Sequence, residues 1–265
     1  MPMKKLFLTV LILGLSGFST ICFGQFQNIQ ANSDTLTTCS EPSITLNPTN
    51  LDNLVIGVNN TFFLTSFDGG NTWTEGQMFS SMGVWGDPSL AFDLDGNLYF
   101  AHLSGEPPLS GRWADRIIIQ KSTDGGLTWN DGTYTGLNRP KFEDKEWISV
   151  DITNSIYKNN LYVAWTEFDT LWYAHPSYKS RILFSRSTDS GETWSNTLEI
   201  SDVEGDCLDD DNTTEGAIPA IGPDGEIYIA WAGPEGIVFD RSFDGGVTFG
   251  EDIFVTEHVG GWGWG

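Results

Sequence analysis

The octet SFDGGNTW at residues 66–73 recurs three more times in this chain with small changes. The other copies are STDGGLTW at residues 122–129, STDSGETW at 187–194 and SFDGGVTF at 242–249. A single copy would be an ordinary turn, but four copies of S-x-D-x-G-x-T-[WF] at a period of roughly 55–65 residues indicate a repeat architecture. Each octet therefore marks the same place in one repeated structural unit.

Each octet has the chemistry of a tight turn. Its last glycine can take a positive φ without steric cost. The Asp carboxylate can accept backbone N–H bonds, and the Ser and Thr hydroxyls can close the turn. The final Trp or Phe supplies an apolar plug between neighbouring units. We therefore expect a structural role for Ser66, Asp68, Gly70, Thr72, Trp73, Ser122, Asp124, Gly126, Thr128, Trp129, Ser187, Asp189, Gly191, Thr193, Trp194, Ser242, Asp244, Gly246, Thr248 and Phe249.

Three β-branched or aromatic runs precede each octet, and a weaker run follows it. In the second unit the three runs are residues 89–92, 97–101 and 116–120, and turn residues such as Asp95-Gly96 separate them. Helical periodicity is nearly absent. The pattern predicts an all-β fold, a β-propeller of four-stranded antiparallel blades, with four blades visible.

The first 24 residues have the pattern of a secretory signal. Lys4 and Lys5 precede an apolar run at residues 6–15, and small residues lead to Gly24. The run is far shorter than the roughly 20 residues that span a bilayer. We predict cleavage after Gly24 and a secreted or extracytoplasmic protein without a transmembrane segment.

The octet resembles the Asp-box, or BNR repeat, of sialidases and sialidase-like propellers, and its four copies cover nearly the whole mature chain. The resemblance implies a six-bladed propeller. We therefore expect residues 40–265, after a lead-in at residues 25–39, to form part of such a ring, incomplete at the C-terminus. Closure into a four-bladed ring is the alternative.

Acidic side chains dominate the composition. The chain has 36 Asp and Glu against 13 Lys and Arg, a formal charge of −23. A nucleic acid partner needs a basic surface, so nucleic acid is excluded, and anionic membranes fit no better. Neutral or cationic partners, or metal ions, fit this charge.

One acidic segment and two cysteines remain open in their roles. Residues 202–212 offer oxygen ligands of the kind Ca²⁺ prefers, and the candidates are Asp206, Asp209 and Asp211. A solvated acidic loop is the alternative, and no cofactor is otherwise required. Cys39 and Cys207 can form one disulfide in an oxidising compartment or remain two separate buried residues.

The working face of the propeller should lie opposite the octets. There, loops lead into the first strand of each blade, and an acidic residue stands where each first strand begins. These residues are Glu41, Asp87, Glu146 and Glu215. We expect the four carboxylates to ring the central channel, with stabilisation of the starting turns as the alternative role.

Two long segments on the same face, residues 102–116 and 167–181, combine aromatic and charged side chains. Flat rings can stack on sugar faces, and long loops are where scaffolds carry function. Ordinary loop packing is the alternative. The substrate-binding candidates are Arg112, Trp113, Trp172, Tyr173 and Tyr178.

The sialidase resemblance also implies candidate catalytic residues. Sialidases use three arginines on the substrate carboxylate, an Asp as general acid and a Tyr nucleophile activated by a Glu. The implied candidates here are Asp87, by location the acid, together with Glu146, Glu215, Arg116 and Arg181. No arginine precedes Arg112, so the arginine motif that comes before the first Asp-box in sialidases is missing.

Three functions therefore stay open. The first is a glycoside hydrolase of exo-α-sialidase type acting on extracellular glycans or glycoproteins. The second is a non-catalytic propeller that binds a glycan or a protein. The third is a structural module of a larger surface protein.

Overall fold

The computed structural model describes residues 28–33, 39–59, 61–105 and 113–261. The predicted signal at residues 1–24 and the candidate Arg112 lie outside the described residues. Within the described residues the structure is all β, without a helix, so none of them forms a helix that could cross a membrane.

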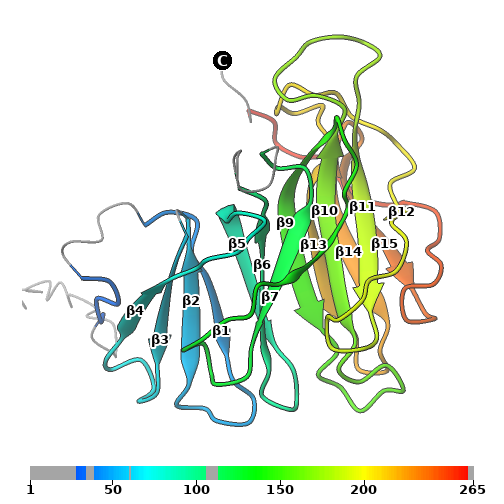
Figure 1. Cartoon of the computed structure of the whole chain (residues 1–265). Helices are drawn as coiled ribbons and strands as arrows, with labels where there is room; N and C mark the ends of the chain where they lie inside the picture. Colours follow the sequence, from blue (N-terminus) through cyan, green and yellow to red (C-terminus); the bar gives the residue numbers. More distant parts are fainter. Residues whose placement is uncertain (1–27, 34–38, 60, 106–112, 262–265) are drawn as a thin grey trace, which may run out of the picture.

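The strands form four antiparallel four-stranded sheets, one for each octet (Figure 1). Blade 1 contains β1 (Ser43–Leu46), β2 (Leu54–Val58), β3 (Phe62–Ser66) and β4 (Thr74–Gln77). Blade 2 contains β5 (Trp85–Phe92), β6 (Leu98–Leu103), β7 (Ile117–Ser122) and β8 (Thr133–Thr135). Blade 3 contains β9 (Phe142–Val150), β10 (Leu161–Phe168), β11 (Ser180–Ser187) and β12 (Leu198–Glu199). Blade 4 contains β13 (Glu215–Ile221), β14 (Ile227–Gly233), β15 (Gly236–Ser242) and β16 (Ile253–Thr256).

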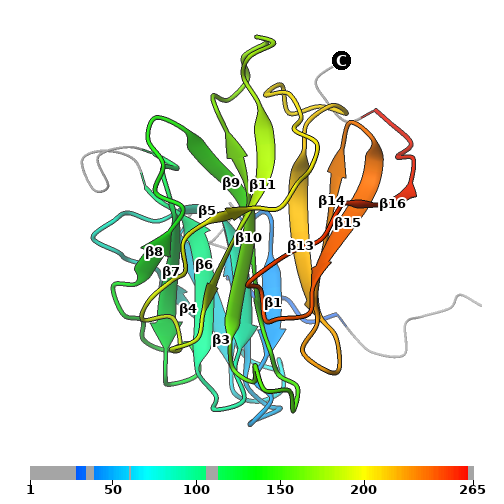
Figure 2. The same cartoon turned by 90° about the vertical axis from the view of Figure 1, so that its right-hand side faces the viewer.

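Each strand pairs with the next one along the chain, which makes every blade a meander. The first strands β1, β5, β9 and β13 are the innermost, and β5 lies against β1 while β9 lies against both β5 and β13. In Figures 1 and 2 the strands of all four sheets lie roughly along one common axis, and the loops gather at its two opposite ends. The predicted blade topology is confirmed.

The core consists of three apolar clusters between successive blades. Phe100 of β6 packs toward blade 1, whereas Tyr99 of the same strand packs toward blade 3. Likewise Tyr162 of β10 packs toward blade 4, and Leu161 packs toward blade 2. Successive side chains of a strand point to opposite faces of its sheet. A strand between two neighbours therefore needs apolar residues on both faces, and β6 and β10 are buried along their whole lengths.

The octets form the turns between third and fourth strands, as predicted. Ser122 Oγ accepts a hydrogen bond from Gly126 N (2.9 Å) and donates one to Asp124 Oδ1 (2.8 Å). Asp124 also accepts bonds from Thr128 N (2.9 Å) and Thr128 Oγ1 (2.6 Å). The same four contacts recur in the other three octets. At Gly126 φ is +91°, and a Cβ would come within 2.8 Å of Val55, so the turn also brings blades 1 and 2 together.

The aromatic ends of the octets join neighbouring blades. The ring of Trp129 packs edge to face with Phe63 of blade 1 and Phe100 of blade 2, with distances between ring centres of 5.6 Å and 5.5 Å. Phe249 of blade 4 contacts Phe184 of blade 3 in the same way (4.8 Å). The predicted plug between blades is confirmed at these two positions.

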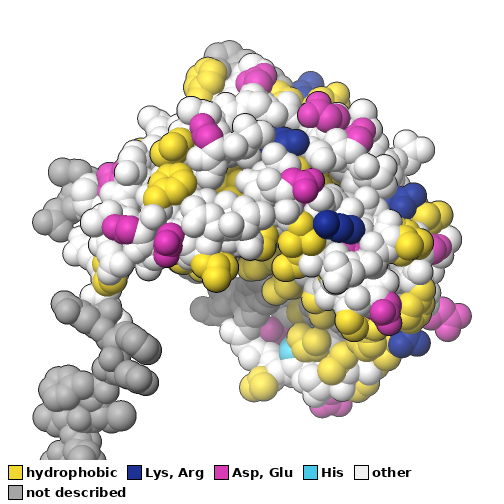
Figure 3. All heavy atoms as spheres, turned by 90° about the horizontal axis from the view of Figure 1, so that it is seen from below, with side chains coloured by type: hydrophobic (Ala, Val, Ile, Leu, Met, Phe, Trp, Pro, Cys, Tyr) yellow, Lys and Arg dark blue, Asp and Glu magenta, His cyan; other side chains and the backbone are white. Residues whose placement is uncertain are grey.

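Figure 3 shows the molecule from the octet end, where hydrophobic side chains gather round a central hollow. β1 and β13, the innermost strands of the first and last blades, each expose an apolar side chain, Ile44 and Ile218. Of the two cysteines among the described residues, Cys207 is buried and Cys39 is exposed, and no disulfide joins them.

Candidate functional site

The four innermost strands share an unusual backbone feature near their beginnings. Glu41, Asp87, Lys145 and Gly216 have φ values of +47°, +53°, +50° and +77°. In blades 2, 3 and 4 the pairing of the first strand also shifts at this point, which marks a β-bulge. Positive φ is rare in residues other than glycine and is often found at functional sites. The bulges turn this stretch of each strand away from regular pairing.

This backbone feature corrects the predicted acidic ring. Glu41 and Asp87 hold equivalent positions in blades 1 and 2, but their equivalents in blades 3 and 4 are Lys145 and Gly216. The predicted Glu146 lies one residue after this position, and the predicted Glu215 lies one residue before it. A shift of one residue along a strand reverses the face to which a side chain points. The four carboxyl groups therefore have different surroundings.

The bulged segments line a cavity of about 260 Å³ at the axis, here called the axial cavity. β1 runs in the same direction as β3, which ends at the octet, so the cavity lies at the end opposite the octets. The lining is formed by four segments, residues 41–43, 87–88, 145–147 and 216–218. Three of the four predicted acidic residues, Glu41, Asp87 and Glu146, stand on these segments, whereas Glu215 is not among the lining residues.

Lys145 organises the charge of the cavity. Its Nζ lies 3.2 Å from Asp87 Oδ2 and 3.8 Å from Glu41 Oε1. Burial works to raise the pKa of Asp87, but the charge of Lys145 and hydrogen bonds from Glu41 and Asp144 hold it below its usual value. Burial works against the charge of Lys145, yet the nearby Asp87, Asp144 and Glu41 raise its pKa. Asp87 and Lys145 are thus an ion pair at neutral pH.

The carboxyl group of Glu146 is in the opposite protonation state from that of Asp87. Glu146 is one of the residues that line the cavity, but it is only 2% exposed, and both of its carboxyl oxygens are buried without a hydrogen-bond partner. Burial, reinforced by the charge of Asp87, raises the pKa of Glu146 well above its usual value. A carboxyl group in such surroundings keeps its proton at neutral pH. The segments that line the cavity therefore carry an ionised Asp87 and a buried, protonated Glu146.

Two further acidic groups lie behind the lining. Burial and the charge of Asp87 raise the pKa of Asp144 to about 8. Burial and the charge of Asp144 raise the pKa of Glu215 to about 8, and Asp209 contributes a side-chain hydrogen bond. Asp144 and Lys145 were not among the predicted site residues. The dense charged run at residues 143–146 was the signal that could have indicated them.

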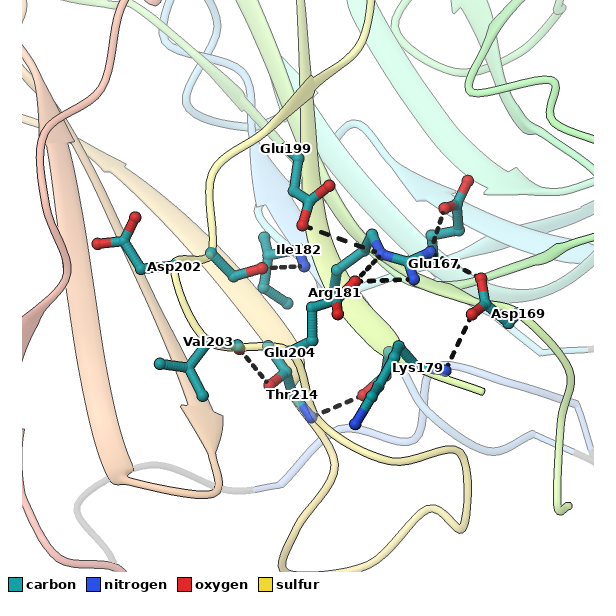
Figure 4. A network of polar contacts seen from close by, with 12 residues as sticks. Glu167, Asp169, Lys179, Arg181, Ile182, Glu199, Asp202, Val203, Glu204 and Thr214 are labelled. Atoms are coloured by element: carbon teal, nitrogen blue, oxygen red, sulfur yellow. Dashed lines mark hydrogen bonds and ion pairs between the residues drawn. The ribbon is translucent and has the colours of Figure 1, made fainter. Parts of the chain in front are cut away.

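The two candidate arginines do not line the axial cavity. Arg116 donates two hydrogen bonds to Asp115 (2.7 and 3.0 Å), and its guanidinium lies over the Tyr134 ring at 5.0 Å. Arg181 is bound by Glu167 (2.7 Å), Asp169 (2.9 Å) and Glu204 (3.0 Å), as Figure 4 shows. Both guanidinium groups are therefore neutralised by carboxylates of the chain itself.

The Arg181 network holds the base of the long segment between β10 and β11. Asp169 N donates to Lys179 O (2.9 Å), and Lys179 N donates to Asp169 Oδ2 (3.0 Å), so the two ends of the segment are tied together. The segment projects beyond the ends of the sheets (Figure 1). Its aromatic candidates Trp172, Tyr173 and Tyr178 are exposed.

The candidate Trp113 packs against other aromatic side chains. Its ring is half-buried and makes edge contacts with Trp85 (5.8 Å) and Phe142 (6.0 Å). It packs against the cluster between blades 2 and 3. Trp113 therefore belongs to the packing between blades, the alternative that the sequence left open.

The candidate calcium ligands interact with other groups of the chain. Asp206 Oδ1 accepts bonds from Leu208 N (3.1 Å) and Thr213 Oγ1 (3.1 Å), and Asp211 Oδ2 accepts one from Gly261 N (2.8 Å). Asp209 interacts with Glu215. In the part of the chain that the structure describes, no three His, Cys, Asp or Glu side chains lie together as a metal site. Calcium binding stays a prediction.

Comparison with known proteins supports the fold. No family model matches the chain, and no curated protein matches it. Among solved structures, a leech intramolecular trans-sialidase complexed with 2,7-anhydro-Neu5Ac has a TM-score of 0.60 at 13% identity, over 86% of this chain and 52% of that one. The intramolecular trans-sialidase from Ruminococcus gnavus, in complex with oseltamivir carboxylate, has a TM-score of 0.58 at 13% identity, over 83% of this chain and 71% of that one. A protein of unknown function from Dyadobacter fermentans has a TM-score of 0.57 at 18% identity, over 81% of this chain and 68% of that one.

These similarities define the class of fold. The chain has a sialidase-like β-propeller fold, and it spans about half the length of the leech enzyme. Identities this low show a shared fold and leave the chemistry to be argued from the site, because one fold can host many functions.

Proposed function

We propose that this protein is a secreted sialidase-like propeller that handles extracellular glycans and cleaves a glycosidic bond in the axial cavity. The observation that carries the proposal is the pair of acidic residues on the segments that line one cavity, Asp87 ionised and Glu146 buried and protonated. Two carboxyl groups whose pKa values are pushed apart are the usual acid and base of glycoside hydrolysis.

The roles follow from the protonation states. Glu146 donates its proton to the glycosidic oxygen as the bond from that oxygen to the sugar carbon breaks. Asp87 accepts a proton from the water that attacks this carbon. Lys145 keeps Asp87 ionised and so acts as a positioning residue. The sequence resemblance had suggested Asp87 as the acid, but its lowered pKa suits a base.

The exposed aromatic residues support glycan handling outside the cavity. Trp172, Tyr173 and Tyr178 lie on a segment that opens at the same end as the cavity and whose base is tied by Asp169. Exposed rings on an anchored loop can stack on pyranose faces at a low entropic cost. They would bind sugar residues next to the one that is cleaved.

A second candidate is glycan binding without catalysis. It is favoured by the state of Arg116 and Arg181, whose guanidinium groups are bound to carboxylates of the chain. Exo-α-sialidase chemistry, which the octet resemblance implies, needs arginines for the substrate carboxylate. Turnover of a fluorogenic sialoside therefore has to be measured directly.

The test is turnover of a panel of fluorogenic glycosides, a sialoside included, by the full chain. Glu146→Gln and Asp87→Asn should each lower kcat by about 10²–10⁴-fold, the usual contribution of an acid or base. Glu192→Gln, an exposed substitution in an octet at the opposite end, is the matched control and should leave turnover unchanged. Turnover that survives both site substitutions would place the chemistry elsewhere, and binding without turnover would favour the second candidate.

A further inference from the structure

Blades 1 and 4 end the series of sheets, and each packs one face against a neighbouring blade (Figure 1). The face of blade 4 that points away from blade 3 is apolar but uncovered. In β10 of blade 3 every residue is buried, whereas β14 of blade 4 alternates between buried and accessible residues. The accessible residues of β14 are Tyr and Ala, so this face lacks the cover that β10 has on both sides.

The uncovered face of blade 4 repeats the residues of a face that is covered in blade 3. Tyr162, Ala164 and Phe184 of blade 3 are completely buried and pack toward blade 4. The residues at the same register positions in blade 4 are Tyr228, Ala230 and Phe239. In blade 4 these three side chains are exposed or half-buried. The face that blade 3 presents to blade 4 therefore occurs again on blade 4, without an occupant among the described residues.

A polar contact crosses each of the three interfaces between blades at the same place. The residue directly before each octet serine donates a hydrogen bond to the carbonyl oxygen of the fourth residue of the next octet. The three pairs are Thr65 and Gly125 (2.9 Å), Lys121 and Ser190 (3.5 Å), and Arg186 and Gly245 (2.8 Å). Arg241 of blade 4 holds the same position and is exposed, and no octet follows it among the described residues.

Blade 1 carries the other half of the same interface, and this half is also uncovered. Ile44 points away from blade 2, because it pairs with Ile56, and the adjacent Val55 packs toward blade 2. Ile44 is 60% exposed, whereas the equivalent Leu90 and Ile148 of blades 2 and 3 are 7% and 2% exposed. The face that blades 2 and 3 turn toward a preceding blade is therefore bare on blade 1.

The octet of blade 1 also differs from the later octets in what lies beside it. A Cβ added at Gly246 in the last octet would come within 2.7 Å of Phe184 in the preceding blade. At Gly70, the equivalent glycine of blade 1, the nearest contact of a Cβ would be Trp73 of the same octet, at 3.5 Å. The described residues therefore include one octet without a preceding blade and one arginine without a following octet.

We propose that these two faces dock on each other between copies of this chain, so that blade 1 of one copy covers blade 4 of the next. Arg241 then donates to the carbonyl oxygen of Gly69 in the octet of the second copy, as Arg186 donates to Gly245 within one chain. One chain carries both halves of the interface, so a second copy supplies what each half lacks. Two copies of four blades each, joined at both ends, make a closed ring within the usual range of about four to eight blades.

The proposed interface also adds a wall beside the axial cavity. Ile218 lines the cavity and pairs with Ala230 in the uncovered face. A blade that docks on this face therefore lies next to the cavity. The inference itself rests on packing between blades and is independent of the proposed function.

Charged substitutions in each face test the interface. Ala230→Arg blocks the face of blade 4, and Ile44→Arg blocks the face of blade 1, and both replace exposed side chains, so both variants should fold. We expect the full chain to dimerise in analytical ultracentrifugation and each variant to weaken the dimer at least about tenfold, because a charge would be buried without a partner. Ile156→Arg, the same change at an exposed position in a turn of blade 3, is the matched control and should leave the dimer unchanged.

A mixture of the two variants gives a readout that a misfolded variant could not produce. A head-to-tail interface uses a different face of each copy, so Ala230→Arg keeps a working blade 1 and Ile44→Arg keeps a working blade 4. An equimolar mixture should therefore regain dimers through the one pair of faces that is intact. Because the chain carries a formal charge of −23, the copies repel each other, and the dimer should strengthen as salt is added.

Three results would overturn the proposal. The first is a chain that stays monomeric at all soluble concentrations, which would leave the two faces to be covered within one chain. The second is a dimer that neither Ala230→Arg nor Ile44→Arg weakens. The third is a mixture that does not dimerise although circular dichroism shows both variants folded, because head-to-tail pairing requires that the intact faces meet.

Discussion

Burial decides the protonation state of individual acidic residues in this protein. The pKa values of Asp144 and Glu215 are raised to about 8, whereas carboxyl groups in an unfolded chain titrate at about 4. Between these values the folded state binds more protons than the unfolded state. The stabilisation from the two protonated groups is complete below the unfolded pKa and is lost as the pH rises through the folded pKa.

The pH dependence of stability tests this state at Glu215. Glu215→Gln keeps the shape of the side chain but cannot ionise. We expect its free energy of unfolding to fall less steeply than that of the unchanged protein between about pH 5 and pH 8, by about 1.4 kcal/mol for each tenfold difference in proton affinity between the folded and unfolded states. Urea denaturation at several pH values measures the difference. Parallel curves for the two proteins would mean that Glu215 is already ionised in the folded state.

A second residue-scale prediction concerns Arg181. A sialidase mechanism would use this residue to bind the carboxylate of the substrate, but in the structure it binds carboxylates of the chain itself. Arg181→Met would remove one of the two cations that bind Glu167 and Asp169 and leave only Lys141, whose Nζ lies 2.6 Å from Glu167 Oε1 and 3.1 Å from Asp169 Oδ1. Removing one partner of a buried ion pair usually costs about 3–5 kcal/mol. Thermal and urea denaturation should show this loss, together with loosening of the segment between β10 and β11. A variant as stable as the parent, but unable to bind glycan, would instead assign Arg181 to the ligand.

At the scale of the strand and turn, the octet combines two functions. The Ser, Asp and Thr side chains close the turn, while the Trp or Phe that ends the octet packs against the adjacent blade. Because the aromatic residue directly follows the turn in the chain, its packing against the adjacent blade also fixes the position of the turn.

Trp129→Ala tests the plug. The ring lies between Phe63 and Phe100, and deletion of a large aromatic from such packing costs about 3–5 kcal/mol. Leu127→Ala in the same octet, where the side chain is exposed, is the control and should stay within about 0.5 kcal/mol of the parent. Equal, small losses in both variants would show that the octet is only a surface turn.

At the scale of the whole molecule, the predicted secretion has a direct test. We expect the exported chain to begin at Gln25, because cleavage after Gly24 removes the basic and apolar segments. Intact-mass measurement of protein from the culture medium checks this. A mature chain that still carries Lys4 and Lys5, found inside the cell, would contradict the prediction.

Much of the fold could be predicted from the sequence because it is periodic. The octets recur in register, and short apolar runs such as the one that forms β6 stand between turn residues at the same place in each repeat. These local patterns have a direct structural meaning, so the blades and the octet turns were predicted correctly. The plug role of Trp129 followed from its size and its place beside a turn.

The candidate site was predicted less completely, because its properties depend on a shift of one residue. Lys145 and Asp144 lie at the bulge of β9, and only the bulge decides which of residues 143–146 faces the cavity. Pairings between distant segments, such as Arg181 with Glu204, also leave no local signal in the sequence. In the sequence alone, Arg116 and Arg181 are therefore candidates for binding a ligand, whereas in the structure both are bound to carboxylates of the chain.

The amino-acid sequence by itself determined the all-β blades, the octet turns and the acidic character of the chain, because each depends on neighbouring residues or on composition. Only the tertiary structure decided the protonation of Glu146, the engagement of Arg181 and the existence of the axial cavity. These features depend on burial and on charges contributed by several blades. Desolvation and Coulomb interactions act through space, and chain order alone does not reveal which groups they will bring together.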